Sequence, residues 1–560
     1  MNKIAIDPIP FRLTIGVTGH RTLQNPDAIR ETVRKVLNKI LSAYSGNEHT
    51  SVKLCALSPM AEGADRLIAQ EILNYHEGSI LQVVLPLTIS DYLDDFTSEQ
   101  SKQEFEHLMS EARSSLSLSE RPLREEYPPE LLEQARTQAY ENVGRFMVNH
   151  CDVLIAVWDG APSRGQGGTA DVIAYAGREK CPVYIIPTDD PSSFQFHEGK
   201  GITDELLKKI DTFNSHITTS GASPDYVHNE FRTLFTNPEI PEGEKLSSQT
   251  KEIIKDTLIP YYTVASSMAK YYQKIYRRVG LLVFWLAFSA VALVGTGTVL
   301  LQKRPICFLS IFFIEFVFLI VILKAIRFAD KKRSHKNWME YRFLAERIRS
   351  AFFLYLGGVE ISSVYINHRA KEGEGDVSGW MSIVFDEIWS SLPKSSAPCG
   401  NDLKVLKAYI SKAWIDDQIS FHEKTCRKNR KKSKGFEIGG STIFYCALLA
   451  SFLHIMFSLI FHYWLRGLHI PFLESFLTLC ALVLPALAAT FEAIRGHREY
   501  KRLSIRSRKM VHKLRALNES FTLLTPERFE KFLKEVDYLM LRETKDWFTV
   551  LSVAELYKAV

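Results

Sequence analysis

The chain has 560 residues, enough for three or four domains of roughly 100–200 residues each. With 46% hydrophobic and 24% charged residues, 29 Gly and 22 Pro, its composition excludes a wholly disordered, collagen-like or low-complexity protein. The net charge is +5, but residues 1–260 hold 25 Lys and Arg against 38 Asp and Glu, whereas residues 261–560 hold 44 Lys and Arg against 26 Asp and Glu. The acidic first half argues against a nucleic-acid groove there and against nucleic acid as a partner.

The N-terminal residues and the cysteines indicate a reducing compartment. Residues 1–8 contain no apolar segment of the kind that a secretory signal peptide requires. The eight cysteines are scattered and include no C-x-x-C pair, which argues against a disulfide scaffold or a zinc ribbon, and no metal site is expected. We therefore expect the first half of the chain to lie in the cytosol.

Residues 12–187 alternate between short apolar runs and helical patterns. The predicted strands are Leu13–Val17, Val52–Leu57, Ile80–Leu87, Val153–Trp158 and Val183–Pro187. The predicted helices are Asp27–Tyr44, Ala64–Leu73, Pro129–Asn149 and Thr169–Gly177. Apolar runs without alternation, separated by helices, predict a parallel sheet that is covered on both faces. The pattern indicates a Rossmann-like α/β domain over residues 1–190, in which a ligand lies outside the carboxyl ends of the strands.

Three turns that follow predicted strands carry residues suited to ligand binding. Glycines let the backbone approach a ligand, a guanidinium can bind phosphate, and the start of a helix offers free N–H groups to an anion. The first turn contributes Gly16, Thr18, Gly19, His20 and Arg21; the second Ser58, Glu62, Gly63 and Asp65; and the third Asp159, Gly160, Arg164, Gly167, Gly168, Thr169 and Asp171. Because these turns share one edge of the predicted sheet, we expect them to form one site.

Other interpretations of these turns are open. A Gly-x-x-Gly turn after a strand is common, and Glu62 and Asp65 could simply cap the helix that follows them. The turns match neither the P-loop nor the G-x-G-x-x-G fingerprint, because Gly16-Val-Thr-Gly19 has the wrong spacing and no Gly-Lys-Ser/Thr occurs. A standard NTPase or dinucleotide oxidoreductase is therefore not expected, and neither is a cofactor.

The motifs Gly16-Val-Thr-Gly-His-Arg21, Glu62-Gly-Ala-Asp-Arg66 and Gly167-Gly-Thr-Ala-Asp171 resemble the SLOG branch of Rossmann-like domains, over about residues 10–190. That superfamily includes lysine-decarboxylase-like cytokinin-activating enzymes, DNA-processing proteins and sensors of nucleotide-derived ligands. Its enzymes carry a P-G-G-x-G-T-x-x-E signature. Here Val172 stands three residues after Thr169, where the enzymes have their glutamate, so the resemblance implies sensing rather than catalysis.

Two segments next to the predicted sheet show little periodicity. Residues 91–140 are acidic and polar, and residues 188–258 contain clusters of Gly, Pro, Ser and Asp. We interpret both as surface elaborations or lids without chemistry, with 191–260 as a linker or elaboration. From Tyr261 the pattern is helical and continues into an apolar span, which predicts a stiff helix between the soluble domain and the membrane.

Four apolar stretches are long enough to cross a bilayer, which requires about 20 helical residues. They are approximately Val279–Leu301, Pro305–Ile326, Ser441–Leu465 and Ile470–Ile494, and they form two tight hairpins within segments 261–360 and 441–560. Lys and Arg gather at the open ends of both hairpins, whereas the tips carry few. The bias predicts that both termini and a helical segment at 361–440 are cytosolic, and that the basic flanks meet lipid headgroups.

Two further features belong to the hairpins. Arg333-Ser-His335 follows the first hairpin and Arg495-Gly-His497 follows the second, which is compatible with a duplication. Glu315 lies near the middle of the second span, where a carboxylate is costly. It is either a pore-lining or gating residue, or a protonated group that is hydrogen-bonded within its hairpin.

The hairpins, with Trp338-Met-Glu-Tyr-Arg342 and Trp414-Ile-Asp-Asp-Gln418, resemble SLATT domains, which are membrane effectors built from a two-helix transmembrane hairpin with cytosolic helical extensions. In bacteria SLATT domains accompany SLOG sensors and nucleotide-messenger systems. The resemblance implies a bacterial inner-membrane protein that acts in antiphage defence by damaging that membrane.

The sequence leads to one main hypothesis and two alternatives. The main hypothesis is a homo-oligomeric membrane effector in which a nucleotide second messenger or an NAD-derived metabolite binds the cytosolic domain and causes the spans to permeabilise the membrane. The first alternative is a membrane-tethered hydrolase of the N-glycosidic bond of nucleotides or NAD, with Glu62, Asp65 or Asp171 as the carboxylate. The second is a channel or scaffold whose soluble domain is structural.

Overall fold

The structure, a computed structural model, describes residues 4, 6–44, 46–96, 98–163, 167–200, 204–301, 304–359, 379–393, 402–463, 471–521 and 524–556. The chain divides into two compact units. Unit 1 comprises Met1–Asn229, Glu252–Val264 and Val359–Ser396, and unit 2 comprises Glu230–Lys251, Ala265–Gly358 and Ala397–Val560. Both units are thus assembled from segments that are far apart in the sequence.

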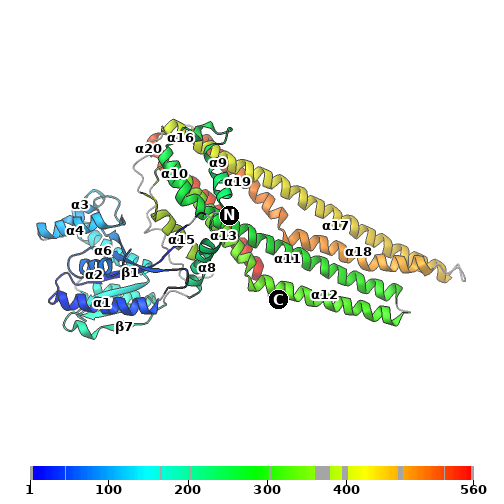
Figure 1. Ribbon diagram of the computed structural model, residues 1–560, viewed down its shortest axis with the longest axis horizontal. Coiled ribbons are helices and arrows are strands. Elements are labelled where there is room, and N and C mark those ends of the chain that lie inside the picture. Colours follow the sequence, from blue (N-terminus) through cyan, green and yellow to red (C-terminus); the bar gives the residue numbers. More distant parts are fainter. Residues whose placement is uncertain are drawn as a thin grey trace. The chain divides into compact units, whose positions relative to one another are not determined.

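Unit 1 contains a β-sheet (Figure 1). Within the described residues the sheet has seven strands in the order β4-β3-β2-β1-β5-β6-β7. The strands are β1 (Phe11–Gly19), β2 (Val52–Ser58), β3 (Ile80–Leu85), β4 (Ser114–Ser117), β5 (Val153–Trp158), β6 (Val183–Pro187) and β7 (Gln195–His197). All neighbouring pairs are parallel except β6 and β7. The predicted mostly parallel, Rossmann-like sheet is therefore confirmed, with β4 and β7 as edge strands that the sequence did not predict.

Helices α1 (Pro26–Ala43), α2 (Ala64–Tyr75), α6 (Leu132–His150) and α7 (Thr169–Arg178) pack on this sheet. The connections also contain α3 (Ile89–Leu93), α4 (Glu99–Glu111) and α5 (Leu123–Glu126). Helix α1 shows why such segments fold as predicted: Asn25 accepts a hydrogen bond from the Ala28 N–H at its start, and Ile29, Val33 and Ile40 lie buried along one face.

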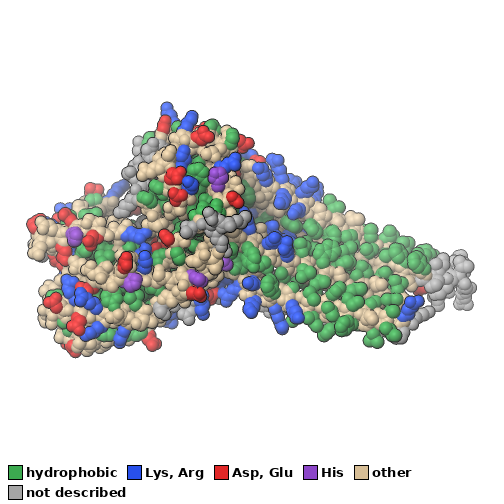
Figure 2. Space-filling model, in the orientation of Figure 1, with side chains coloured by type: hydrophobic (Ala, Val, Ile, Leu, Met, Phe, Trp, Pro, Cys, Tyr) green, Lys and Arg blue, Asp and Glu red, His purple; other side chains and the backbone are tan. Residues whose placement is uncertain are grey.

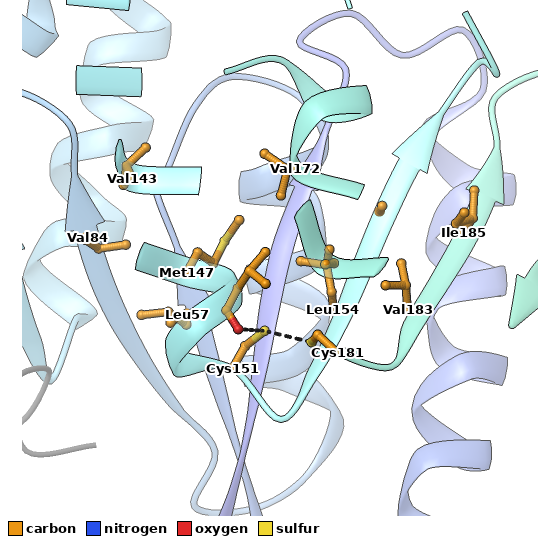
Figure 3. Packing of buried hydrophobic residues seen from close by; sticks show 13 residues of the cluster. Leu57, Val84, Val143, Met147, Cys151, Leu154, Val172, Cys181, Val183 and Ile185 are labelled. Carbon is orange, nitrogen blue, oxygen red and sulfur yellow. Dashed lines mark hydrogen bonds between the residues drawn. The ribbon is translucent and has the colours of Figure 1, made fainter. Parts of the chain in front are cut away.

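A hydrophobic core lies where α6 and α7 pack on the sheet (Figure 3). Met147 of α6 and Val172 of α7 meet Leu154 of β5, and all three side chains are buried. Cys151 and Cys181 lie in the same core with their sulfur atoms 3.7 Å apart, and neither forms a disulfide. Burying each such aliphatic side chain contributes about 1.5–3 kcal/mol, so this core holds the start of α7 firmly against the sheet.

The direction of the strand order reverses at β1. Strands β1 to β4 follow one another outward on one side, whereas β5 returns to the other side of β1 and pairs with Ile15–Gly19. In open α/β sheets a ligand binds in the crevice at such a switch point, outside the carboxyl ends of the strands. A binding site is therefore expected beside Gly19 and Trp158.

The two segments that were predicted to be elaborations are largely structured. Residues 91–140 contain α4, α5 and β4, and the latter pairs with β3 through Gln82–Leu85. Residues 188–258 contain β7, α8 (Asp204–Ser220), α9 (Pro224–Phe235) and α10 (Ser248–Ile253). Residues 191–260, which the sequence predicts to be a linker or an elaboration, contain buried side chains such as Phe213 of α8 and Phe235 of α9.

Long helices dominate unit 2. They are α11 (Ile259–Leu300), which begins in unit 1, and α12 (Pro305–Lys331), α13 (Ser334–Leu356), α17 (Asp417–Tyr463), α18 (Pro471–His497), α19 (Tyr500–Phe521) and α20 (Pro526–Leu556). Among the described residues, four helices are long and apolar enough to cross a membrane. They contain most of each of the four predicted spans, while the ends of the third and fourth predicted spans at 464–465 and 470 lie outside the described residues. The chain is therefore a membrane protein.

The surface of these four helices is mainly apolar, with Lys and Arg side chains gathered at one end (Figure 2). Large side chains such as Ile306, Leu309 and Phe313 are exposed on α12, which is costly in water and favourable in lipid. The observed division between apolar and basic surface is the one that a bilayer and its headgroups require.

The tripeptides that follow the two hairpins meet at one tyrosine. The rings of His335 and His497 lie 4.6 Å and 4.8 Å from the ring of Tyr276 on α11. Gly280, one turn further along α11, makes room for His497, because a Cβ there would lie 2.4 Å from its Nε2. The segments that follow both hairpins thus pack on α11, the first helix of the first hairpin.

Candidate functional site

A cleft of about 790 Å³ lies in unit 1 at the carboxyl ends of β1 and β5. Nine of the predicted site residues line it: Thr18, Gly19, His20, Arg21, Asp65, Asp159, Gly167, Gly168 and Thr169. They come from all three predicted turns, which the structure brings together at one edge of the sheet. The volume falls within the range of about 300–1,000 Å³ that is typical of small-molecule sites.

The start of α7 faces this cleft. Gly168 is the N-cap residue and provides no side-chain cap, and Thr169 and Ala170 of the first turn line the cleft. The N–H groups of a first helical turn lack partners inside the helix and carry partial positive charge. Their placement makes this end of the cleft suited to a phosphate or another anion.

The turn before α7 depends on Gly167 and Asp171. Gly167 has φ of +85°, and a Cβ there would lie 2.7 Å from the backbone nitrogen of Glu141, so no other residue fits easily. Its N–H donates to Asp171 Oδ2 at 3.0 Å. Asp171 therefore holds the turn in place and is not one of the residues that line the cleft.

Other predicted residues also support the cleft from outside it. Gly16 packs against Cys151, and a Cβ at Gly16 would lie 2.9 Å from the cysteine sulfur. Ser58 is buried and donates to the Asp65 carbonyl at 3.3 Å, while Glu62 accepts a hydrogen bond from Ser101.

Gly63 has φ of +83°, and a Cβ there would lie 2.2 Å from the Arg21 carbonyl oxygen. Gly160 is likewise absent from the residues that line the cleft, and Arg164 lies outside the described residues.

His20 and Asp159 connect the ends of the two central strands. The Asp159 N–H lies 3.1 Å from His20 Nε2, which can accept from it when neutral or donate to Asp159 Oδ1, also at 3.1 Å, when protonated. A hydrogen bond from the Ala161 N–H, and then the neighbouring imidazole, lower the pKa of Asp159. The pair therefore closes the floor of the cleft between β1 and β5.

Four residues that the sequence analysis did not single out form another wall of the cleft: Tyr92, Asp95, Arg136 and Tyr140. Arg136 and Tyr140 lie four residues apart on α6, and both donate to Asp95. The Arg21 guanidinium carbon lies 6.0 Å from the centroid of the Tyr140 ring. The i, i+4 spacing of Arg136 and Tyr140 in a predicted helix was the only sequence signal for this wall.

Asp65 and Tyr92 are the most unusual lining residues. Asp65 is 4% exposed and Tyr92 is fully buried, and within the described residues Asp65 Oδ1 and the Tyr92 hydroxyl have no hydrogen-bond partner. Burial raises the pKa of the Asp65 carboxyl to about 8, so it is mainly protonated at neutral pH and can donate a hydrogen bond. A buried polar group without a partner costs about 1–3 kcal/mol, which a ligand that pairs with it would offset.

Within the part of the chain that the structure describes, no group of three or more His, Cys, Asp and Glu side chains could hold a metal ion. Scans of the chain against protein-family models and against curated proteins found no match. The resemblances to SLOG and SLATT domains therefore depend on the motifs alone, and the chemistry of the cleft has to be argued from its residues.

Proposed function

We propose that this membrane protein is an effector whose cleft binds a nucleotide-derived ligand and whose spans respond by permeabilising the membrane. One observation carries the proposal: the cleft at the switch point of the sheet combines two kinds of binding group. The uncapped start of α7 and Arg21 suit a phosphate. Asp65 and Tyr92 suit the hydroxyl or amide groups of a ribose or base.

The connection to the membrane runs through a continuous helix. Residues Ser248–Leu300 form a helix of 53 residues, of which 252–264 belong to unit 1 and the rest, including the first span, to unit 2. A ligand shifts the spans from a resting to an active arrangement only if it binds the active arrangement more tightly. Changing the ratio of active to resting molecules from 1:99 to 99:1 requires a difference in binding free energy of about 5.5 kcal/mol. Closure of the start of α7 and the wall formed by Tyr92 and Tyr140 around one ligand would supply such a preference.

Titration calorimetry on the full chain in detergent tests the binding step, with a panel of cyclic and linear nucleotides and NAD-derived metabolites. Gly168→Asp is the informative variant, because φ of −71° at Gly168 allows any residue and Asp is a good helix cap. Its charge should repel a bound phosphate and lower the affinity at least tenfold. Gly168→Asn has the same shape and capping ability without the charge, so it should bind more tightly than Gly168→Asp.

Equal affinities of the Asp and Asn variants would mean that no anion lies at α7. Absence of binding across the whole panel would favour the alternative in which unit 1 is a structural domain of a channel or scaffold.

Antiphage defence and an inner-membrane location enter the proposal through the SLOG and SLATT resemblances. Bacteria that express the wild-type chain should resist phage infection at the expense of membrane integrity, measured by plaque counts and by uptake of a membrane-impermeant dye. Cells with the Gly168→Asp variant should show neither effect, although the protein is present at the same level.

Hydrolysis of an N-glycosidic bond is a second candidate function, and Asp65 favours it. A protonated carboxyl in a cleft can donate a proton to a departing base, and perturbed pKa values are frequent at catalytic sites. The other two candidate carboxylates, Glu62 and Asp171, do not line the cleft. Release of free base from NAD or a nucleotide by the full chain, abolished in Asp65→Asn, would establish this activity in place of sensing.

A further inference from the structure

The basic end of the four spans in unit 2 contains cations of two kinds. Some are neutralised by acids: Arg495 lies 3.2 Å from Glu437 and 2.8 Å from Glu492, and Arg502 lies 3.1 Å from Glu499. Because the glutamates neutralise these arginines, the pairs do not require an external anion.

A second group has no such partners. Arg277 of α11, Lys428 and Lys432 of α17, and Arg498 directly after α18 form no ion pair with any carboxylate among the described residues. The Arg498 guanidinium donates to the Arg277 carbonyl oxygen at 2.9 Å, which brings the two arginines together. We refer to Arg277, Lys428, Lys432 and Arg498 as the cation cluster.

The cation cluster lies beside aromatic rings, and its members repel one another. Lys432 Nζ lies 5.6 Å from the ring centroid of Tyr500, and the Arg277 guanidinium carbon lies 6.0 Å from that of Trp338. Partial burial, and then the neighbouring cations, lower the pKa of both Arg277 and Lys432. Cations held together in this way repel one another unless an anion lies between them.

The place of the cluster along the helices indicates which anion it meets. Arg277 precedes the first apolar span by two residues and Arg498 follows the fourth by four, which at about 1.5 Å per residue is within the headgroup layer of a bilayer. Lys432 and Lys428 precede the third span by nine and thirteen residues, so they approach that layer from its outer side. A phosphate in that layer belongs to a lipid. Arg277 and Trp338 belong to the first hairpin and its extension, whereas Lys432 and Arg498 belong to the second.

We propose that the cation cluster is a binding site for the phosphate of an anionic phospholipid, which bridges the two hairpins at the membrane surface. The site does not depend on the proposed nucleotide ligand, because it lies in unit 2 and its partner is the bilayer. An anionic headgroup relieves the repulsion among the cations and so favours close packing of α11 against α17 and α18.

The full chain in nanodiscs tests this proposal. One set of nanodiscs contains phosphatidylcholine alone and the other contains phosphatidylcholine with phosphatidylglycerol. We expect native mass spectrometry to show retained phosphatidylglycerol, and a higher melting temperature in the anionic discs. The variant Arg277→Gln, Lys432→Gln, Arg498→Gln should lose retention by about fivefold for each cation removed, since one basic residue near an anionic surface contributes about 1 kcal/mol.

A matched control is Arg327→Gln, Lys331→Gln, Lys332→Gln, which removes three exposed cations at the end of α12 without touching the cluster. This control should retain most of the bound lipid. In phosphatidylcholine alone the cluster variant should melt at or above the wild-type temperature, because the repulsion is gone, which separates loss of lipid from loss of fold.

Two results would overturn the proposal. Equal loss of phosphatidylglycerol in the cluster and control variants would mean that general surface charge attracts the lipid. Stabilisation of the wild type in phosphatidylcholine discs by inorganic phosphate, to the same extent as by phosphatidylglycerol, would mean that the cluster takes free phosphate instead.

Discussion

At the scale of single residues, Asp65 and Tyr92 depart furthest from ordinary behaviour. Both are almost completely buried beside the cleft, and each has a polar atom without a partner in the described part of the chain. Such groups weaken a fold, and proteins commonly keep them where function requires it. Substitutions at these two residues should therefore change the free energy of unfolding and the affinity for the ligand in opposite directions.

Replacing Tyr92 with Phe should have opposite effects on these two quantities. The change removes a buried hydroxyl that has no partner, so the ligand-free protein should gain about 1 kcal/mol in unfolding free energy. The affinity for the nucleotide should fall about tenfold if the hydroxyl pairs with the ligand. Thermal melting and titration calorimetry on the same preparation check both effects, and an unchanged affinity would exclude Tyr92 from the ligand contacts.

Asp65 should make stability depend on pH. Its pKa rises from an ordinary value of about 4 to about 8 in the folded protein, so its contribution to stability is complete below pH 4 and is lost as the pH rises through 8. The free energy of unfolding should fall in this window by at most about 1.4 kcal/mol per pH unit.

Melting temperatures between pH 4 and pH 9 check this expectation. The Asp65→Asn variant should show a flatter profile than the wild type, whereas Glu62→Gln in the same turn should follow the wild type. Parallel profiles for Asp65→Asn and the wild type would show that Asp65 ionises in the folded protein as it does in the unfolded chain.

At the scale of elements, α11 is the proposed connection between cleft and membrane. Lys270 is exposed on this helix, six residues after the boundary between the units. Lys270→Pro should break the helix there at a cost of about 3 kcal/mol. Nucleotide binding should persist in this variant while membrane leakage is lost, and Lys270→Ala, which removes the same side chain, should preserve both. Leakage that survives the proline would exclude transmission through an intact α11.

Glu315 of α12 is an intramembrane carboxylate on a partly covered face. Side chains at positions 308, 311, 315, 318 and 322 are less exposed than most others on this helix, and Glu315 forms no hydrogen bond or ion pair with any described residue. A carboxylate in this position suits a water-filled path better than lipid.

We expect Glu315→Gln to lower the preference of the leak for cations over anions, measured from reversal potentials in planar bilayers. Glu492→Gln should not, since Glu492 pairs with Arg495 at the end of its span. The same selectivity in Glu315→Gln and the wild type would remove Glu315 from the path.

The elements that could be predicted from the sequence are those with a recognisable hydrophobic pattern within their own residues. The central strands, α1, α2, α6 and α7, and the four spans all have continuous or periodic apolar runs. Strand β4, Ser-Ser-Leu-Ser, has none, and it pairs only because the edge of β3 is available. Helix α3 has five residues, too few to show a period, yet it contributes Tyr92 to the cleft.

The site was predicted to a similar extent. Glycine-rich turns identify the edge of the sheet from sequence alone, because parallel strands bring their carboxyl ends together. Whether a residue faces the cleft or supports it from behind depends on tertiary contacts. Asp171 and Glu62 are used by neighbouring backbone or side-chain groups, whereas Asp65 keeps a free oxygen, and no local pattern distinguishes the three.

At the scale of the whole molecule, a unit with an α/β sheet is joined in one chain to a helical unit that spans the membrane. Acidic residues outnumber basic ones in the first 260 positions, and basic residues outnumber acidic ones after them. Many of these Lys and Arg side chains lie at one end of the apolar helices (Figure 2). This division suits a protein that recognises a small ligand in one unit and anionic lipid in the other.

Release of a trapped dye from vesicles that contain the full chain tests the central claim most directly. We predict that release begins only when the nucleotide identified by calorimetry is added, with a midpoint that matches its dissociation constant, and that Gly168→Asp vesicles stay sealed. Release at the same rate without nucleotide, or sealed vesicles in the presence of a nucleotide that saturates the cleft, would contradict it.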